Sequence, residues 1–183
     1  MKGRFLGYVL LAASLAACGG AGSGGSSTTA DAFARALQAQ TAGKYDEATV
    51  AYYEVLAKEP KNSAAFYNLG LIAQLQNRAV AAEAYYRLAL EQDPNNEKAL
   101  FNLAIIRANV GATQEAIDLY RRVIARLPSY ADAHYNLALL LRQIGQTAEA
   151  QQEFATAQRL DPKLVAPSAS ATPARPATPS PTR

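Results

Sequence analysis

Four of the nine prolines in this chain recur at a fixed interval of 34 residues. They are Pro60, Pro94, Pro128 and Pro162, and the other five follow Val165. A constant spacing of this length indicates a repeat array, in which each unit is one supersecondary structure that buries its apolar face by stacking on its neighbours. The proline period therefore predicts four stacked units.

Other residues recur in register with these prolines. An alanine lies twelve residues before each proline, and an aromatic residue follows that alanine by four: Ala48, Ala82, Ala116 and Ala150, then Tyr52, Tyr86, Tyr120 and Phe154. A leucine lies 25 residues before each of the last three prolines, within FYNLG (66–70), LFNLA (100–104) and HYNLA (134–138). This pattern resembles the tetratricopeptide repeat. The resemblance implies an all-α fold, a right-handed α-solenoid of about four helical hairpins over residues 30–162, with repeats at about 29–62, 63–96, 97–130 and 131–162.

The residues within each unit support helical hairpins independently. In the second unit, Phe66, Leu69 and Ile72 recur at helical spacing, and Ala82 and Tyr86 begin a second such block. Turn-forming residues separate the two blocks of each unit, at 41–46, 76–78, 110–113 and 144–147. The first unit has Arg35 and Ala36 where Leu-Gly is expected, so we interpret it as a divergent amino-terminal capping repeat.

The amino-terminal segment has the organisation of a secretory leader. Lys2 and Arg4 precede an apolar run from Phe5 to Ala17. As a helix this run spans about 20 Å, less than the roughly 30 Å of a bilayer's hydrocarbon core. Residues 1–17 are therefore predicted to be a signal peptide rather than a membrane span.

The leader ends in LAAC, Leu15 to Cys18, which resembles the lipobox of bacterial lipoproteins. The resemblance implies cleavage before Cys18, acylation of that cysteine, and attachment to a membrane of the bacterial cell envelope. Several acyl chains on one residue anchor a protein stably. Gly19 stands where an aspartate would retain a lipoprotein at the inner membrane in some bacteria, which favours the outer membrane, facing the periplasm. As the only cysteine, Cys18 has no partner for a disulfide within the chain.

Both flanks of the array differ from it in composition. Residues 18–29 are rich in glycine, serine and threonine, which predicts a flexible tether. Residues 163–183 are rich in proline, alanine, serine and threonine, which predicts a disordered tail with polyproline-II character. Many arrays of the family end in an extra amphipathic helix, for which only 163–166 is available here. We therefore expect the last helix, Ala148 to Leu160, to leave apolar surface open, a candidate homodimer contact.

Nothing in the sequence favours catalysis, a cofactor, a metal ion or nucleic acid. His134 is the only histidine, has no Cys/His cluster around it, and is assigned to helix packing. Gly20, Gly22 and Gly25 form a G-x-G-x-x-G, but the run before them belongs to the leader and helical hairpins follow, so the context of a dinucleotide site is missing. Outside Lys2 and Arg4 the chain has 16 basic and 15 acidic residues, too balanced to attract nucleic acid.

The candidate binding surface is the concave face that the first helices form in this family. Three columns recur along it: aromatic residues Phe33, Tyr67, Phe101 and Tyr135; aliphatic residues Leu37, Leu71, Ile105 and Leu139; and asparagines Asn68, Asn102 and Asn136. An apolar, aromatic groove favours binding of another protein, as an extended segment or a helix. The asparagines either pair with the backbone of a bound peptide or form bonds within their own repeats, and the sequence leaves both alternatives open.

A specialised version of this groove, the carboxylate clamp of chaperone-binding members, does not fit. Asn68 and Lys98 match its pattern, but Phe33 and Leu37 stand where it has lysine and asparagine. We therefore expect a lipid-anchored scaffold that binds a partner protein in the assembly of an envelope machine such as a pilus or secretion system. The alternatives are an adaptor for a peptidoglycan or cell-wall enzyme and a self-assembling structural lipoprotein.

Overall fold

The computed structural model describes residues 28–167, and this range forms eight α-helices and no β-strand. They are α1 (Thr29–Thr41), α2 (Tyr45–Lys58), α3 (Ser63–Leu75), α4 (Ala79–Gln92), α5 (Glu97–Asn109), α6 (Thr113–Arg126), α7 (Ala131–Gln143) and α8 (Thr147–Leu160). The predicted leader at 1–17, Cys18 with the rest of the tether to residue 27, and residues 168–183 lie outside the described residues. Within 28–167, no helix is both long enough and apolar enough to span a bilayer.

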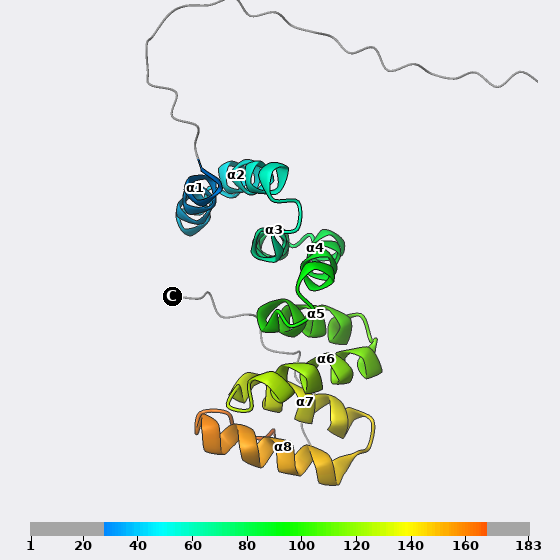
Figure 1. The fold of residues 1–183 in the computed structure, drawn as a ribbon. Helices are drawn as coiled ribbons and strands as arrows, with labels where there is room; N and C mark the ends of the chain where they lie inside the picture. The colour runs from blue at the N-terminus through cyan, green and yellow to red at the C-terminus, as the bar shows by residue number, and fades with distance from the viewer. Residues whose placement is uncertain (1–27, 168–183) are drawn as a thin grey trace, which may run out of the picture.

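Successive helices pair into hairpins that stack in chain order, from α1 and α2 at one end to α7 and α8 at the other (Figure 1). The first helix of each hairpin has 13 residues and the second has 14. The prediction of an all-α solenoid of four helical hairpins is confirmed.

Every hairpin turns through the same backbone conformation. A residue with positive φ follows each first helix: Gly43 (73°), Asn77 (59°), Gly111 (80°) and Gly145 (82°). The next amide donates to the carbonyl five residues earlier, as from Arg78 to Ala73 at 2.8 Å and from Ala112 to Arg107 at 2.9 Å. This Schellman motif needs a left-handed residue, which glycine adopts freely and asparagine at a moderate cost. Sequence and backbone therefore share the 34-residue period.

Side-chain caps begin several of the first helices. Thr28 forms a capping box with Asp31 at α1, and Asn62 and Asn96 each accept a hydrogen bond from a backbone amide of the first turn at α3 and α5. These bonds satisfy donors that have no partner within the helix.

Small residues and one large ring per repeat fill the interior. Tyr52, Tyr86 and Tyr120 are fully buried and Phe154 nearly so. The core divides within the second repeat: one cluster joins α1, α2 and α3, from Ala32 to Ile72, and a larger cluster begins at Ala73 and extends through α8.

Gly70 shows how closely the two helices of the second hairpin approach. A Cβ at Gly70 would lie 2.6 Å from Cε1 of Tyr86. The rings of Tyr67 and Tyr86 are tilted by 34° there. In the other repeats alanine occupies this position (Ala36, Ala104 and Ala138), and the corresponding ring pairs meet edge to face at 67° to 74°. The missing methyl group is what admits the flatter arrangement.

The first repeat differs where the sequence diverges. Arg35 is exposed and forms an ion pair with Glu54 at 2.6 Å, whereas Leu69, Leu103 and Leu137 at the same repeat position are buried. Helix α1 has no preceding hairpin to cover this position, so a charged side chain is compatible with it.

Candidate binding groove

The first helices carry all of the predicted groove residues. Figure 1 shows α1 and α3 on the same side of their hairpins, opposite α2 and α4. Each groove aromatic packs against the buried ring of its own second helix, with centroids 5.5–6.0 Å apart in the four pairs Phe33–Tyr52, Tyr67–Tyr86, Phe101–Tyr120 and Tyr135–Phe154. These contacts hold the aromatic column on a fixed support.

The structure divides the predicted groove into two parts. In the first two repeats, Phe33, Tyr67 and Leu71 are half-buried and Leu37 is 40 % exposed; we call these four residues the open half. The remaining groove residues lie in the third and fourth repeats and form the closed half: Phe101, Asn102, Ile105, Asn136 and Leu139 are buried, and Tyr135 is half-buried. Phe101 is additionally stacked on Tyr130, with centroids 4.8 Å apart.

The three asparagines have three different environments. Asn68 donates from Nδ2 to the carbonyl of Ala64 in its own helix at 2.8 Å, which realises the within-repeat alternative at that position. Asn102 lies beside Tyr67: burial raises the pKa of that phenol, and the Asn102 side chain opposes part of the rise. Asn136 is 1 % exposed, and neither Nδ2 nor Oδ1 has a hydrogen-bond partner within residues 28–167.

A tyrosine–glutamine bond recurs in the first two repeats and is lost in the third. Tyr52 donates from Oη to Oε1 of Gln40 at 2.7 Å, and Tyr86 donates to Gln74 at the same distance. The equivalent of these glutamines in the third repeat is Ala108. The Tyr120 hydroxyl is consequently buried with no hydrogen-bond partner in the described part of the chain.

The fourth repeat replaces this pair by another. Arg142 occupies the glutamine position, and its guanidinium Cζ lies 5.4 Å from the ring centroid of Phe154, which has no hydroxyl to bond. Nη2 of Arg142 is buried and lacks a partner among the described residues. We call Tyr120 Oη, the Asn136 amide and Arg142 Nη2 the polar cluster. Burial strongly raises the pKa of Tyr120, and Asn136 opposes that rise, so Tyr120 stays a neutral hydroxyl.

The chain beyond α8 returns to α7. Residues 163–167 form neither helix nor strand, and the amide of Leu164 donates to the carbonyl of Asp161 at 3.0 Å. Tyr135 then donates from Oη to the carbonyl of Val165 at 3.5 Å, and Arg142 donates from Nη1 to the carbonyl of Pro167 at 2.9 Å. The sequence pattern did not reveal this contact.

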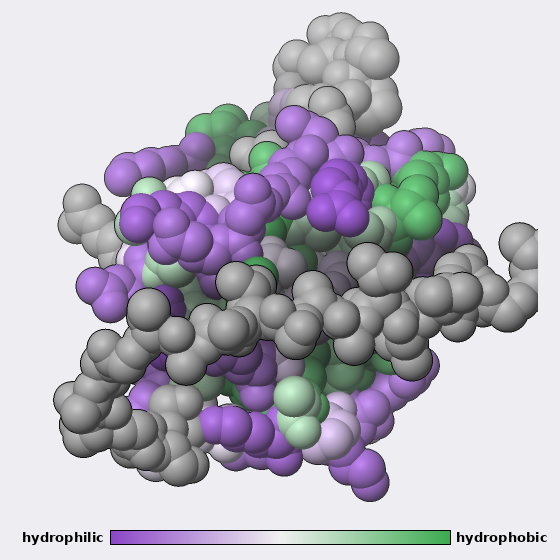
Figure 2. Space-filling view, turned by 90° about the horizontal axis from the view of Figure 1, so that it is seen from above, coloured by the Kyte–Doolittle hydropathy of each residue, from purple (hydrophilic) through white to green (hydrophobic). Residues whose placement is uncertain are grey.

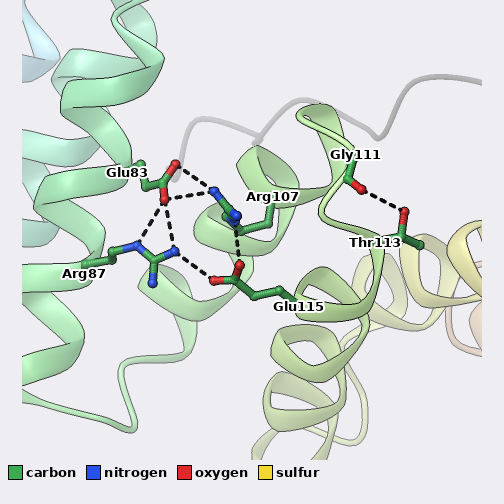
Figure 3. A network of polar contacts seen from close by, with 6 residues as sticks. All are labelled: Glu83, Arg87, Arg107, Gly111, Thr113 and Glu115. Atoms are coloured by element: carbon green, nitrogen blue, oxygen red, sulfur yellow. Dashed lines mark hydrogen bonds and ion pairs between the residues drawn. The ribbon is translucent and has the colours of Figure 1, made fainter.

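A network of four charged side chains joins α4, α5 and α6 (Figure 3). Arg107 contacts Glu115 at 2.7 Å and Glu83 at 3.1 Å, and Arg87 contacts the same two carboxylates at 2.8 and 3.0 Å. Burial works to raise the pKa of Glu115, but the hydrogen bonds from Arg87 and Arg107 outweigh it and lower the pKa. All four groups are paired, so the network fixes the junction of the second and third repeats.

The exposed face of α8 is less apolar than the sequence led us to expect. Its outward residues are mainly glutamine and alanine, and its one large exposed apolar side chain is Leu160, because Phe154 packs inward. Seen from the α1 end, hydrophilic side chains cover much of the visible surface and hydrophobic ones form separate patches (Figure 2).

His134 is buried between α7 and α8. Nε2 contacts the carbonyl of Pro128 at 2.9 Å and Nδ1 contacts Oε2 of Glu153 at 2.5 Å. This geometry agrees with the packing role assigned from the sequence. Across residues 28–167, no group of three or more His, Cys, Asp or Glu side chains is arranged to hold a metal ion.

The fold and its aromatic groove define a class, the helical-hairpin solenoids, and the comparisons with known proteins identify the family. Residues 33–97, 85–118 and 109–169 each match a family model of the tetratricopeptide repeat. The matches together extend from residue 33 to 169, and the chain is a tetratricopeptide repeat protein.

Solved structures similar to this chain come from the same family. A crystal structure of MamA is 25 % identical, has a TM-score of 0.66, and is covered over 73 % of each chain. A tetratricopeptide repeat protein from Parabacteroides merdae is also 25 % identical with a TM-score of 0.66, over 74 % of this chain and 54 % of that one. YrrB, described as having an unusual peptide-binding site, shares the fold at 23 % identity and a TM-score of 0.62, over 73 % and 69 %. No curated protein sequence matches significantly.

Proposed function

We propose that this protein is a lipid-anchored scaffold of the bacterial cell envelope, which binds an extended segment of a partner protein along the open half of its groove. That the chain is a tetratricopeptide repeat protein supports a role in protein–protein interaction. The envelope location rests on the predicted leader and on Cys18 within LAAC. The partner would belong to an envelope machine such as a pilus or secretion system.

The observation that carries the proposal is the accessible apolar surface of the open half. Phe33 and Tyr67 each present one ring edge outward while the other side packs on Tyr52 or Tyr86. Leu37 and Leu71 lie one helical turn further along the same faces. Rings that are already fixed lose little conformational entropy on binding, so their apolar area contributes efficiently to affinity.

The dimensions suit an extended chain. Packed helices lie about 8–10 Å apart, and an extended segment advances about 3.3 Å per residue. Every third residue of such a segment would therefore meet the next aromatic of the column. The groove residues carry no charge, which favours a partner segment of apolar and small polar residues.

An anchor adds to this affinity. Acyl chains on Cys18 would confine the array to a membrane surface, and residues 19–28 would let it sample orientations there. For a partner on the same membrane, binding then occurs at a raised effective concentration.

The test is crosslinking and pull-down from native membranes with two matched variants. Tyr67→Ala removes a ring of the open half, and Val80→Ala removes an apolar side chain that is 87 % exposed on α4, away from the groove. We expect the crosslinked species to be lost with Tyr67→Ala and kept with Val80→Ala. If both variants keep it, the groove is not the binding surface. Circular dichroism melts show whether the variants remain folded.

A further inference from the structure

We infer that the carboxyl-terminal segment of this chain, residues 163–183, is an intramolecular ligand of the concave groove. It docks on the closed half, and a partner segment must compete with it to occupy the full length of the groove. The inference deepens the proposed function, because it uses the same groove, but the experiment below contains no partner.

The first support is direct contact. The chain leaves α8 with a turn at Asp161 and extends along α7, where Tyr135 and Arg142 donate hydrogen bonds to the carbonyls of Val165 and Pro167. Tyr135 and Arg142 are seven residues apart, two helical turns, and therefore lie on one face of α7. Side-chain donors on that face thus already bind the backbone of an extended segment.

The second support is a difference in burial between the two ends of the array. Leu37 and Leu139 occupy the same repeat position, each on a first helix with a neighbouring hairpin on only one side. Leu37 is 40 % exposed and Leu139 is 4 % exposed. Leu139 lies between Tyr135 and Arg142 on the face of α7 that contacts residues 165–167, whereas Leu37 has no such cover among the described residues.

The third support is the polar cluster. The Asn136 amide, Tyr120 Oη and Arg142 Nη2 are buried and unpartnered within the described range. Buried polar groups are normally satisfied, and an extended backbone offers both donors and acceptors at short intervals. Arg142 has used Nη1 on one carbonyl of the segment, so Nη2 remains for another acceptor.

The composition of the segment matches the spacing of the groove. Pro167, Pro173, Pro176 and Pro179 are separated by multiples of three residues. A polyproline-II helix turns once every three residues and rises about 3.1 Å per residue, so these prolines recur about every 9 Å along one edge. Neighbouring first helices, at about 8–10 Å, present one aromatic each at nearly the same interval. Aromatic grooves commonly bind proline-rich segments in this conformation.

Length and charge permit the contact to continue. Residues 168–183 would reach about 50 Å as polyproline II, against about 30 Å for three steps between neighbouring first helices. The segment 163–183 has no acidic residue and only three basic ones, and the predicted groove residues are uncharged. No charge must therefore be desolvated in the groove.

The experiment measures binding of a fluorescein-labelled peptide, residues 163–183, by fluorescence anisotropy. The receptors are the full chain and a chain that ends at Pro162, which keeps every helix the structure describes. We expect the peptide to bind the shortened chain and to bind the full chain about tenfold more weakly. That ratio follows from an effective concentration of about 1 mM for the attached segment and a Kd of about 0.1 mM.

Proline variants supply the matched controls. A peptide with Pro173→Ala, Pro176→Ala and Pro179→Ala should lose affinity for the shortened chain, whereas Pro181→Ala, which is out of the three-residue period, should leave it unchanged. The same three substitutions in the full chain should free the groove, so that the unmodified peptide binds it as tightly as it binds the shortened chain.

Three results would overturn the inference. They are equal binding of the peptide to both chains, no binding to a shortened chain whose circular dichroism melt is intact, and a full chain that elutes as a dimer which the shortening converts to a monomer. The last result would assign the contact to a second copy. Because no partner is present, failure here leaves the Tyr67→Ala test of the proposed function standing, and failure of that test leaves this one standing.

Discussion

The Tyr120 hydroxyl allows a sharp test because the second repeat supplies its control. Tyr86 and Tyr120 occupy the same repeat position and are both fully buried, but only Tyr86 has a glutamine to bond, at 2.7 Å. A neutral hydrogen bond contributes about 1 kcal/mol to stability, whereas a buried polar group without a partner costs about 1–3 kcal/mol. Tyr86→Phe should therefore destabilise by about 1 kcal/mol, and Tyr120→Phe should be neutral or stabilising by up to about 1 kcal/mol.

Urea unfolding measures the difference. With a slope of about 2 kcal/mol/M, 1 kcal/mol moves the midpoint by about 0.5 M, and an unchanged slope shows that only stability has changed. Equal losses for the two variants would refute the reasoning, because they would mean that Tyr120 has a partner as good as Gln74. Phe154 at the same position of the fourth repeat shows that the fold accepts a ring without a hydroxyl.

Restoring the missing glutamine is the complementary experiment. Ala108→Gln should stabilise the protein by about 1 kcal/mol when Tyr120 is present, by recreating the bond of the first two repeats. In the Tyr120→Phe background the same change should bring no such gain. A double-mutant cycle isolates the pairwise contribution. A gain that is independent of the hydroxyl would assign the effect to helix propensity or packing.

Three further outcomes are expected. Gly70→Ala should stabilise by up to about 1 kcal/mol in a thermal melt, because the Tyr86 ring can adopt the edge-to-face geometry of the other repeats; a loss above about 1 kcal/mol would show that the ring is locked. The lowered pKa of Glu115 makes its charge stabilising above its ordinary value of 4.5, and this stability is lost as the pH falls below it. Glu115→Gln should therefore flatten the acid limb of a stability–pH curve by less than about 1 kcal/mol, the range for a partly exposed pair; an unchanged limb would exclude Glu115 as its source. Cys18→Ser should leave an uncleaved precursor on gels, and normal processing would contradict the lipobox.

The sequence period predicted the architecture because each repeat position has one dominant physical requirement. The turns need a left-handed residue, and Gly43, Gly111 and Gly145 announced it; Asn77 met the same requirement within a segment already assigned as a turn. Proline ended each second helix for a comparable reason, since the residue before it is driven out of the helical region.

The groove was less predictable, because identical repeat positions acquire different surroundings. Leu37 and Leu139 cannot be distinguished by the pattern, yet their burial differs with the neighbouring chain segments. A signal for the polar cluster did exist: Gln40 and Gln74 recur at 34 residues, and Ala108 breaks the series. The network around Arg107 offered no such signal, since its four charges follow no repeat period.

The division of the apolar core within the second repeat has a consequence for how the molecule opens. Helices α1 and α2 belong wholly to the smaller cluster, and α5 and α6 to the larger one. Stability in a stacked array is a sum of local terms, so segments with fewer buried neighbours exchange their amide hydrogens through smaller openings. Amides of α1 and α2 should exchange before those of α5 and α6. Local unfolding would then begin next to the predicted tether, and the last hairpins would retain their structure while the first one opens and closes.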